Sequence, residues 1–186
     1  MSYCDVVHAL PAGSTDPNRH YHDHEYGFPL VDDNALFGRL VLEINQAGLS
    51  WTLMLKKQAA FFAAYDGFDI ATVAAYGEAE RTRLLADAGI VRNRLKIEAV
   101  IHNAGQILRL QDEYGSFKAW LDAHHPRPLS AWLTLFRKTF RFVGGEIVNE
   151  FLMSTGYLPG AHQPDCPVYA RVLAAHPPWC WGERMS

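Results

Sequence analysis

Cysteine and histidine residues near the two ends of the chain form two pairs that could bind a metal. Cys4 and His22 lie near the N-terminus, and His162 and Cys166 lie in the run A-H-Q-P-D-C-P. Zinc binds four cysteine or histidine side chains in a tetrahedron, so these four residues would make a chemically complete Cys₂His₂ site. Because such a site leaves no position for water, it predicts a structural metal that ties the N-terminal segment to the C-terminal region.

Two other sets of residues compete with this one on spacing. His20, His22 and His24 alternate along the chain, and two of them would share a face if the segment were extended. His176 and Cys180 repeat the H-x3-C spacing near the C-terminus. The chain has nine histidines and three cysteines, so some close pairs arise by chance. Spacing alone does not choose between these sets.

A glutamate in an apolar stretch is the second candidate for chemistry. The segment L-E-I-N-Q-A-G-L-S-W places Glu43 among aliphatic residues, with Trp51 eight positions later. A carboxylate in apolar surroundings is costly unless it has a partner. Beside an indole ring, it would suit a flat, cationic, amine-bearing ring through charge, hydrogen bonds and stacking. The alternative is a surface glutamate on the polar face of a helix with Trp51 in the core, and the residues alone favour that alternative.

Glycines in the run V-G-G, residues 143–145, join two segments with helical periodicity. Glycine lets a backbone approach a partner closely, and the helix that follows offers free N–H groups to an anion. Arg137, Lys138 and Arg141 come just before the run. The pattern predicts a phosphate-binding hairpin, although glycine turns between helices are also common without any ligand.

Composition limits the class of protein. The chain has 186 residues, of which 49% are hydrophobic, so it can bury a substantial core as one or at most two compact domains. No run approaches the roughly 18–20 apolar residues that span a bilayer, and the N-terminus lacks the features of a signal peptide. Three widely spaced cysteines do not make a disulfide framework. We therefore expect a soluble, cytoplasmic protein without a membrane partner.

The net charge of −3 argues weakly against binding to nucleic acid, but it hides local basic clusters. These are Lys56 with Lys57, the basic residues within 92–96, and the group before the V-G-G run. A solvated helix face is the default interpretation of any one of these clusters.

The periodicity of apolar residues predicts an all-α protein of many short helices. The first 30 residues, which contain several prolines and glycines, are predicted to be a loop. Helices are expected over residues 32–46, 49–64, 70–76, 79–88, 93–114 and about 145–154, with two further short helices around Trp120 and over S-A-W-L-T-L-F. No stretch shows the sustained alternation that is typical of a strand.

Five segments, taken in order, resemble the bacterial 3-methyladenine DNA glycosylase I family. They are H-Y-H-D-H-E-Y-G, L-E-I-N-Q-A-G-L-S-W-T-L-M-L-K-K, D-A-G-I-V-R-N-R-L-K-I-E-A-V, F-R-F-V-G-G and A-H-Q-P-D-C-P. The resemblance runs from Cys4 to about Pro167. It implies a helix-hairpin-helix DNA glycosylase-like bundle of two helical lobes, forming one unit over residues 1–186. A zinc clasp would join the segments 4–22 and 162–166.

The resemblance also implies roles for particular residues. One structural Zn²⁺ would be held by Cys4, His22, His162 and Cys166, which demotes the second H-x3-C pair.

The base pocket would contain Tyr21, Glu43 and Trp51. Glu43 would be the catalytic and base-recognising acid, accepting hydrogen bonds from the amine edge of an extruded adenine on which Trp51 stacks. The hairpin that grips DNA would be Val143, Gly144 and Gly145.

The implied activity is hydrolytic removal of 3-methyladenine, and of other N3-alkylated purines where the pocket admits them, from double-stranded DNA. The enzyme would act as a monomer and leave an abasic site without cutting the strand, because no lysine is evident as a Schiff-base nucleophile. A non-catalytic, zinc-stabilised module that binds DNA damage is the alternative. A zinc hydrolase is disfavoured by four protein ligands.

Three positions bear on this comparison with the family. An aromatic residue is common two positions after the N-terminal cysteine, where this chain has Val6, and Tyr26 replaces a tryptophan. Such changes in the pocket wall would admit 3-methylguanine or another alkylated base. Asp165, between two expected metal ligands, is interpreted as support for the metal site.

Overall fold

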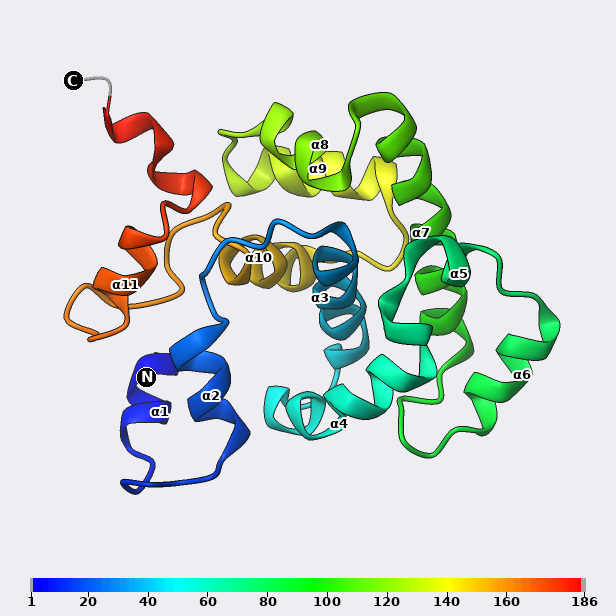
Figure 1. The fold of residues 1–186 in the computed structure, drawn as a ribbon, viewed down its shortest axis with the longest axis horizontal. Helices are drawn as coiled ribbons and strands as arrows, with labels where there is room; N and C mark the ends of the chain where they lie inside the picture. Colours follow the sequence, from blue (N-terminus) through cyan, green and yellow to red (C-terminus); the bar gives the residue numbers. More distant parts are fainter. Residues whose placement is uncertain (1, 185–186) are drawn as a thin grey trace.

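The computed structural model describes residues 2–184, and within that range the chain folds into α-helices and two short 3₁₀ helices without a strand (Figure 1). In chain order, the elements are α1 (Tyr3–His8), α2 (Pro17–His24), α3 (Asp33–Gln46), α4 (Trp51–Ala64), η1 (Asp66–Phe68), α5 (Ile70–Ala74), α6 (Glu78–Ala86), α7 (Arg94–Tyr114), α8 (Phe117–His124), α9 (Leu129–Thr139), α10 (Gly145–Ser154), α11 (Tyr169–Ala174) and η2 (Pro178–Arg184). The all-α prediction is confirmed. None of the described helices is both long enough and apolar enough to cross a bilayer.

Helix α3 runs through the middle of the molecule and contacts α4, α7, α8 and α10 (Figure 1). It begins where Asp32 accepts a hydrogen bond from the N–H of Ala35, close to the start of the predicted helix over residues 32–46. Its side chains are buried without interruption from Leu36 to Asn45. A helix with neighbours on every side buries whatever polar residue its sequence contains. Glu43 is therefore carried into the interior.

The N-terminal segment is helical, so the prediction that the first 30 residues form a loop is wrong. Ser2 and Asp5 make a capping box that begins α1. Asp16 accepts a hydrogen bond from the N–H of Asn18, and Pro17 occupies the first position of α2. The Asp16-Pro17 pair begins a helix here instead of breaking one.

Most other helices lie close to their predicted limits. Helix α4 begins at Trp51, because the Ser50 side chain accepts a hydrogen bond from the N–H of Leu53. Helix α10 runs over Gly145–Ser154, as predicted. After it, α11 and η2 add helical structure that the sequence analysis did not predict.

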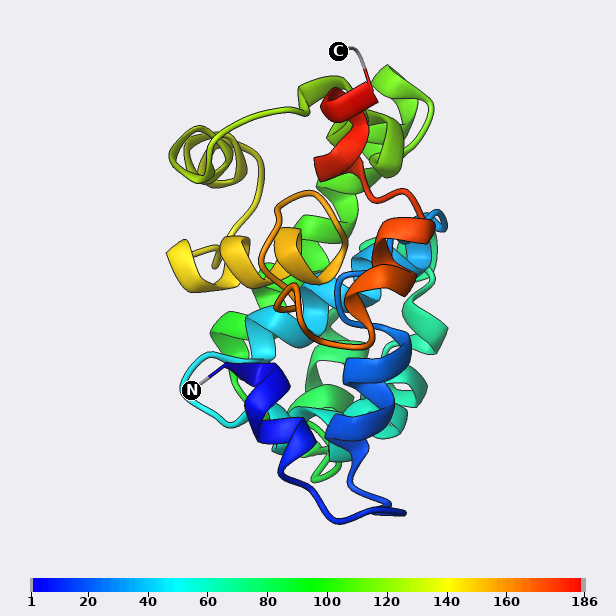
Figure 2. The ribbon, with the colours of Figure 1, turned by 90° about the vertical axis from the view of Figure 1, so that its left-hand side faces the viewer.

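The two terminal regions lie side by side. In Figures 1 and 2 the N-terminal helices α1 and α2, in blue, lie next to the orange segment that leads into α11. Cys4 packs there with Cys166, Val168 and Val172 in a small hydrophobic cluster, separate from the main core that extends from α3 to α10. The fold therefore brings together segments that are about 160 positions apart in the chain. The division of residues 1–186 into two lobes stays a prediction.

Candidate functional site

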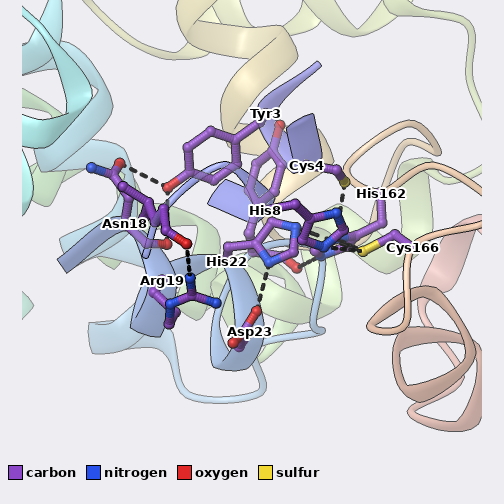
Figure 3. Close-up of polar contacts among 11 residues, drawn as sticks. Tyr3, Cys4, His8, Asn18, Arg19, His22, Asp23, His162 and Cys166 are labelled. Atoms are coloured by element: carbon purple, nitrogen blue, oxygen red, sulfur yellow. Dashed lines mark hydrogen bonds and ion pairs between the residues drawn. The ribbon is translucent and has the colours of Figure 1, made fainter. Parts of the chain in front are cut away.

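Four buried side chains converge where the terminal segments meet. Cys4 comes from α1, His22 from α2, and His162 and Cys166 from the loop before α11 (Figure 3). Their ligand atoms all lie within 4.8 Å of one another. The sulfur-to-nitrogen distance is 3.7 Å from Cys4 Sγ to His162 Nδ1, and also from Cys166 Sγ to His22 Nε2 and to His162 Nδ1. A tetrahedral zinc with ordinary bond lengths separates its sulfur and nitrogen ligands by about 3.6 Å, so the group can hold a metal.

The second ring nitrogen of each histidine has a fixed partner. His22 Nδ1 lies 2.7 Å from Asp23 Oδ1, and His162 Nε2 lies 2.7 Å from the Tyr26 carbonyl oxygen. Both oxygens are acceptors, so these nitrogens carry the protons and the opposite nitrogens turn lone pairs toward the sulfurs. Burial lowers the pKa of His162, which keeps its ring in the neutral, metal-binding form. The expected support from Asp165 is wrong: that side chain is exposed, and Asp23 and the Tyr26 carbonyl take its place.

The competing ligand sets lie outside this group. Because α2 is helical and not extended, His20 and His24 lie one turn apart, and their exposed rings pack at 4.9 Å. The Cys180 thiol donates a hydrogen bond to the Pro177 carbonyl oxygen. Near the group itself, the exposed His8 places its Nε2 3.8 Å from the sulfur of Cys166, a neighbour that the sequence analysis did not foresee.

A cavity of about 210 Å³ lies against the other side of the N-terminal helices. A cavity of about 150 Å³ is enough to bind benzene, so this volume is room for a ring system. It is lined by Tyr3, Tyr21, Tyr26, Glu43, Gln46, Trp51 and Glu150. The structure thus brings the three predicted pocket residues, Tyr21, Glu43 and Trp51, to one cavity.

Glu43 is buried and 3% exposed, and its carboxyl makes no hydrogen bond to any residue whose side chain is described. Burial raises its pKa to about 8; Arg39 opposes that rise and Glu150 adds to it. Trp51 is only partly buried, and its indole N–H also lacks a partner among the described residues. The alternative of a surface glutamate with Trp51 in the core is therefore wrong. Both groups belong to residues that line the cavity, and neither has a hydrogen-bond partner within the described part of the chain.

Arg39 holds one wall of the cavity. Its Nη1 donates to the Tyr21 hydroxyl at 2.9 Å, its Nη2 pairs with Glu25 Oε2 at 3.2 Å, and its guanidinium lies 4.9 Å from the centre of the Tyr21 ring. The Tyr21 ring packs on Trp51 with centroids 5.1 Å apart and planes at 58°. Because Arg39 contacts both the hydroxyl and the ring of Tyr21, the Tyr21 ring is held in a fixed position against Trp51.

The aromatic wall also includes Tyr26, as the sequence analysis expected, and Tyr3, which the sequence analysis did not place there. Val6 is 44% exposed and is not among the residues that line the cavity. Tyr3, which immediately precedes Cys4, supplies a ring instead, and its hydroxyl donates to Asn18 Oδ1 at 2.9 Å (Figure 3). The Tyr3 and Tyr26 rings meet edge to face at 5.3 Å. The loss of an aromatic residue at Val6 is therefore accompanied by a ring from the same short helix.

Gln46 and Glu150 complete the lining. Gln46 follows Glu43 by three positions on α3, so helical spacing would have placed them on one face. Glu150 comes from α10, more than 100 positions away in the chain, and no local pattern indicates that it faces Glu43.

The V-G-G hairpin lies between α9 and α10. Gly144 has φ −88° and gives α10 no side-chain cap. A Cβ at Gly144 or Gly145 would meet nothing within 4 Å, so neither backbone geometry nor internal packing requires glycine there. Asn103 holds the entry to the hairpin by bonding both the N–H and the carbonyl oxygen of Arg141, at 2.8 and 3.0 Å. Val143 is buried, Gly144 and Gly145 are partly buried, and no side chain caps the N–H groups at the start of α10.

A groove of about 470 Å³ connects the hairpin to the cavity. It is lined by residues of α3, the loop after α3 and the first turns of α10, namely Glu43, Gln46, Ala47, Gly48, Leu49, Gly144, Gly145, Glu146, Ile147 and Glu150. Glu43, Gln46 and Glu150 line both the groove and the cavity, so the two hollows adjoin.

The predicted basic clusters differ in exposure. Lys57 donates to backbone carbonyls of the loop after α6, and Lys96 is buried with its ammonium on carbonyls at the C-terminal end of α3. Arg137, Lys138 and Arg141, next to the hairpin, are exposed. The predicted clusters at 56–57 and 92–96 are thus partly structural, whereas the cluster at the hairpin is available to an anion.

Comparisons with known proteins agree with this geometry. A family model described as methyladenine glycosylase matches residues 12–132. DNA-3-methyladenine glycosylase 1 of Escherichia coli (strain K12) is 34% identical, over 80% of this chain and 89% of that protein. DNA-3-methyladenine glycosylase of Haemophilus influenzae is 29% identical, over 79% of this chain and 89% of that protein.

Solved structures give the same result. 3-Methyladenine DNA glycosylase I from Staphylococcus aureus matches with a TM-score of 0.75 at 33% identity, covering 84% of this chain and 94% of that one. A tyrosine-to-phenylalanine variant of 3-methyladenine DNA glycosylase I, in complex with 3-methyladenine, matches with a TM-score of 0.74 at 32% identity, covering 84% of this chain and 95% of that one.

Proposed function

The chain belongs to the methyladenine glycosylase family, and on that premise we propose that it is a DNA glycosylase that removes 3-methyladenine from alkylated double-stranded DNA. The observation that carries the proposal is the cavity in which Glu43, buried and without a hydrogen-bond partner, lies beside Tyr21 and Trp51. The product is free base and an abasic site, with the strand left intact.

The chemistry requires little machinery. Methylation at N3 makes adenine a cationic leaving group, so the glycosidic bond is already weak. The enzyme needs to extrude the nucleotide, recognise the base and favour the charge that develops as the bond breaks. A base that binds in the cavity meets Trp51 as a stacking partner and Glu43 as an acceptor for its exocyclic amine. Because the ligand is a cation, its arrival favours the ionised form of Glu43.

The hairpin supplies the grip on DNA. The N–H groups at the start of α10, after Val143, Gly144 and Gly145, have no side-chain cap and suit a backbone phosphate. The exposed Arg137 and Lys138 add positive charge beside it. The groove from the hairpin to Glu43 then carries the extruded nucleotide into the cavity.

Leu49 lies at the rim of this groove, in the loop between α3 and α4, and its side chain is 38% exposed. An apolar side chain in that position suits the space that an extruded base leaves in the duplex.

We propose that the metal is one structural Zn²⁺ bound by Cys4, His22, His162 and Cys166. Four protein ligands leave no position for substrate or water, so the ion cross-links the terminal segments and takes no part in the reaction. Cavity, hairpin and metal group all come from one chain, which supports action as a monomer. The proposal predicts stoichiometric zinc in protein purified without chelator.

The test is release of free bases from DNA treated with dimethyl sulfate, resolved by chromatography. Wild-type protein should release 3-methyladenine, and Glu43→Gln should lose nearly all of that release. Glu113→Gln removes an exposed carboxylate from α7 and should behave as wild type. Binding of methylated DNA without any release would replace the proposal with a non-catalytic damage-binding module.

A further inference from the structure

Phe142, in the hairpin between α9 and α10, has a backbone conformation that aromatic residues rarely adopt. Its φ is +57°, in the left-handed region where a Cβ atom crowds the backbone. Glycine takes this conformation without that cost, and the hairpin has glycines two and three positions later. A strained residue persists only where the surrounding structure or a ligand offsets its cost. The contacts of the Phe142 ring therefore indicate what the residue is for.

Phe68 has the same backbone conformation and shows how burial offsets it. Its φ is +58°, but its side chain is 6% exposed and belongs to the main hydrophobic core. The ring packs on those of Phe37, Phe62 and Tyr65, with centroids 5.8–6.5 Å apart. Burial of a large aromatic ring is strongly stabilising. Packing within the protein therefore accounts for the strain at Phe68.

Phe142 lacks that compensation. Its side chain is 39% exposed and belongs to none of the hydrophobic clusters of the described residues. Within residues 2–184 the ring packs on no other aromatic ring. It lies instead against the buried Lys96, whose ammonium is 5.8 Å from the ring centre. A single exposed apolar side chain needs no explanation, but one that also carries backbone strain indicates a ligand.

Lys96 places the ring beside the loop that carries Leu49. Its ammonium donates to the carbonyl oxygens of Asn45 and Ala47, at 2.9 and 2.8 Å, where α3 ends. Phe142 therefore lies next to the start of the α3–α4 loop. This loop and the hairpin glycines line one groove. Two exposed apolar side chains, Leu49 and Phe142, thus come from the two segments that meet at this groove.

The charge around the ring suits DNA. Arg141 directly precedes Phe142 and is exposed, as are Arg137 and Lys138 at the end of α9. Basic side chains attract the phosphate backbone, whereas apolar side chains pack where bases have left the regular stack. An aromatic ring stacks on an unstacked base of any type. The combination is that of a surface that meets DNA at a disturbed base step.

We propose that Phe142 is a further DNA-contacting residue, whose ring packs against the bases beside the extruded nucleotide. The inference rests on the proposed glycosylase function. It gives the strained ring a contact with unstacked bases, which is distinct from the phosphate contact proposed for the N–H groups at the start of α10. Binding to DNA with an interrupted stack should therefore depend on Phe142 more than binding to an intact duplex does.

The experiment is fluorescence anisotropy with two labelled duplexes, one intact and one with a tetrahydrofuran abasic-site analogue. Phe142→Gly should weaken binding to the abasic duplex about 10- to 30-fold, as expected for one lost base–aromatic stack, and binding to the intact duplex less than about threefold. Its Tm should equal or exceed that of wild type, because glycine relieves the strain. Phe142→Tyr, which keeps the ring, should restore binding to within about threefold of wild type.

Three further variants serve as controls. Phe68→Gly relieves the same backbone conformation but removes a core ring, so its Tm should fall by about 6–20 °C. Phe62→Ala removes a 56% exposed ring from α4 and should not change affinity for either duplex. Phe142→Asn lacks the ring, and asparagine also tolerates the left-handed region. It should match Phe142→Gly in binding, which separates loss of the ring from the flexibility of glycine.

Wild-type affinity of Phe142→Gly and Phe142→Asn for the abasic duplex would overturn the inference. So would an equal loss on both duplexes, because the ring would then not contact unstacked bases. A Tm of Phe142→Gly well below wild type would overturn it too, since the ring would then serve the fold. In each of these cases, release of 3-methyladenine by wild-type protein leaves the proposed function intact. Folded wild-type protein that releases no 3-methyladenine would remove the proposed function itself.

Discussion

In the metal-binding group each buried histidine uses both ring nitrogens, whereas in the neighbouring cavity Glu43 and the Trp51 indole have no hydrogen-bond partner among the described residues. Both regions are polar and buried. The difference is that both ring nitrogens of each histidine have a partner within the protein, whereas the Glu43 carboxyl and the Trp51 N–H have none among the described residues. Buried polar atoms are normally paired, so unpaired ones indicate a place that a ligand completes.

The two regions share their structural elements. Tyr3 and Tyr21 face the cavity, and the next residues in the chain, Cys4 and His22, face the metal group. Successive residues on a helix point about 100° apart, so one short helix can serve two sites on different sides. Tyr26 alone contributes to both sites: its side chain lines the cavity, and its carbonyl oxygen accepts a hydrogen bond from His162 Nε2. Order in the metal group therefore sets the position of the aromatic wall.

The largest effect is expected from removal of a metal ligand. Cys166→Ser should lose the proposed Zn²⁺ and lower Tm by about 10–15 °C, because that ion would cross-link the two terminal segments and 1 kcal/mol corresponds to ~2–4 °C at this size. Excision should fall with it, since the aromatic wall loses its support. Metal analysis and thermal melting provide the measurements. Cys180→Ser, outside the group, should leave metal content and Tm unchanged. Full metal content in Cys166→Ser would contradict the proposed dependence of the cavity on the metal group.

Removal of the cavity acid should have the next largest effect on activity. Glu43→Gln should lower kcat/KM for 3-methyladenine about 100-fold, because it removes a negative charge from a site where a cation is bound. In the wild-type enzyme, kcat/KM should rise with pH toward about 8 as Glu43 ionises. The variant should lack this rise. A variant with the same pH profile as wild type would mean that Glu43 is not the group that titrates.

The same substitution should stabilise the protein. The folded-state pKa of Glu43, about 8, lies above the ordinary value of 4.5, so between these values the folded state binds more protons than the unfolded state. Wild-type stability from this group is thus full below about pH 4.5 and declines as pH rises toward 8. Glu43→Gln does not titrate and should gain about 3–5 kcal/mol over wild type by pH 8. Urea unfolding at pH 5, 7 and 8 measures this, and Glu113→Gln should show no such trend.

The smallest effect is expected at the hairpin. There the N–H groups at the start of α10 also lack a side-chain partner among the described residues. Gly145→Ala adds a methyl group with nothing within 4 Å and should leave Tm within about 2 °C. It should weaken binding to duplex DNA about three- to tenfold, because the methyl would stand where the proposed phosphate contact is made. Fluorescence anisotropy with labelled DNA is the measurement. Gly105→Ala in α7, equally uncrowded, should not change DNA affinity; equal effects would mean that the hairpin is not the contact.

Local rules predicted much of the helical framework. The limits of α3 and α10 and the apolar period through α3 depend on residues within one or two turns, and the structure agrees with the predicted ranges 32–46 and about 145–154. The same rules failed at Asp16-Pro17, because that pair is compatible both with a turn and with the first turn of a helix. Only the packing of α2 against α1 and α4 decides between them.

The two sites, like the helices, were determined partly by the sequence and partly by the tertiary structure. The sequence by itself determined the types of the ligands, Cys4 and His22 with His162 and Cys166, and placed an acid eight positions before Trp51. The tertiary structure decided which Cys/His pairs meet, because they are separated by more than 140 positions and spacing carries no information at that distance. It also decided that Glu43 is buried, since α3 is enclosed on all sides, and that Glu150 joins it from α10.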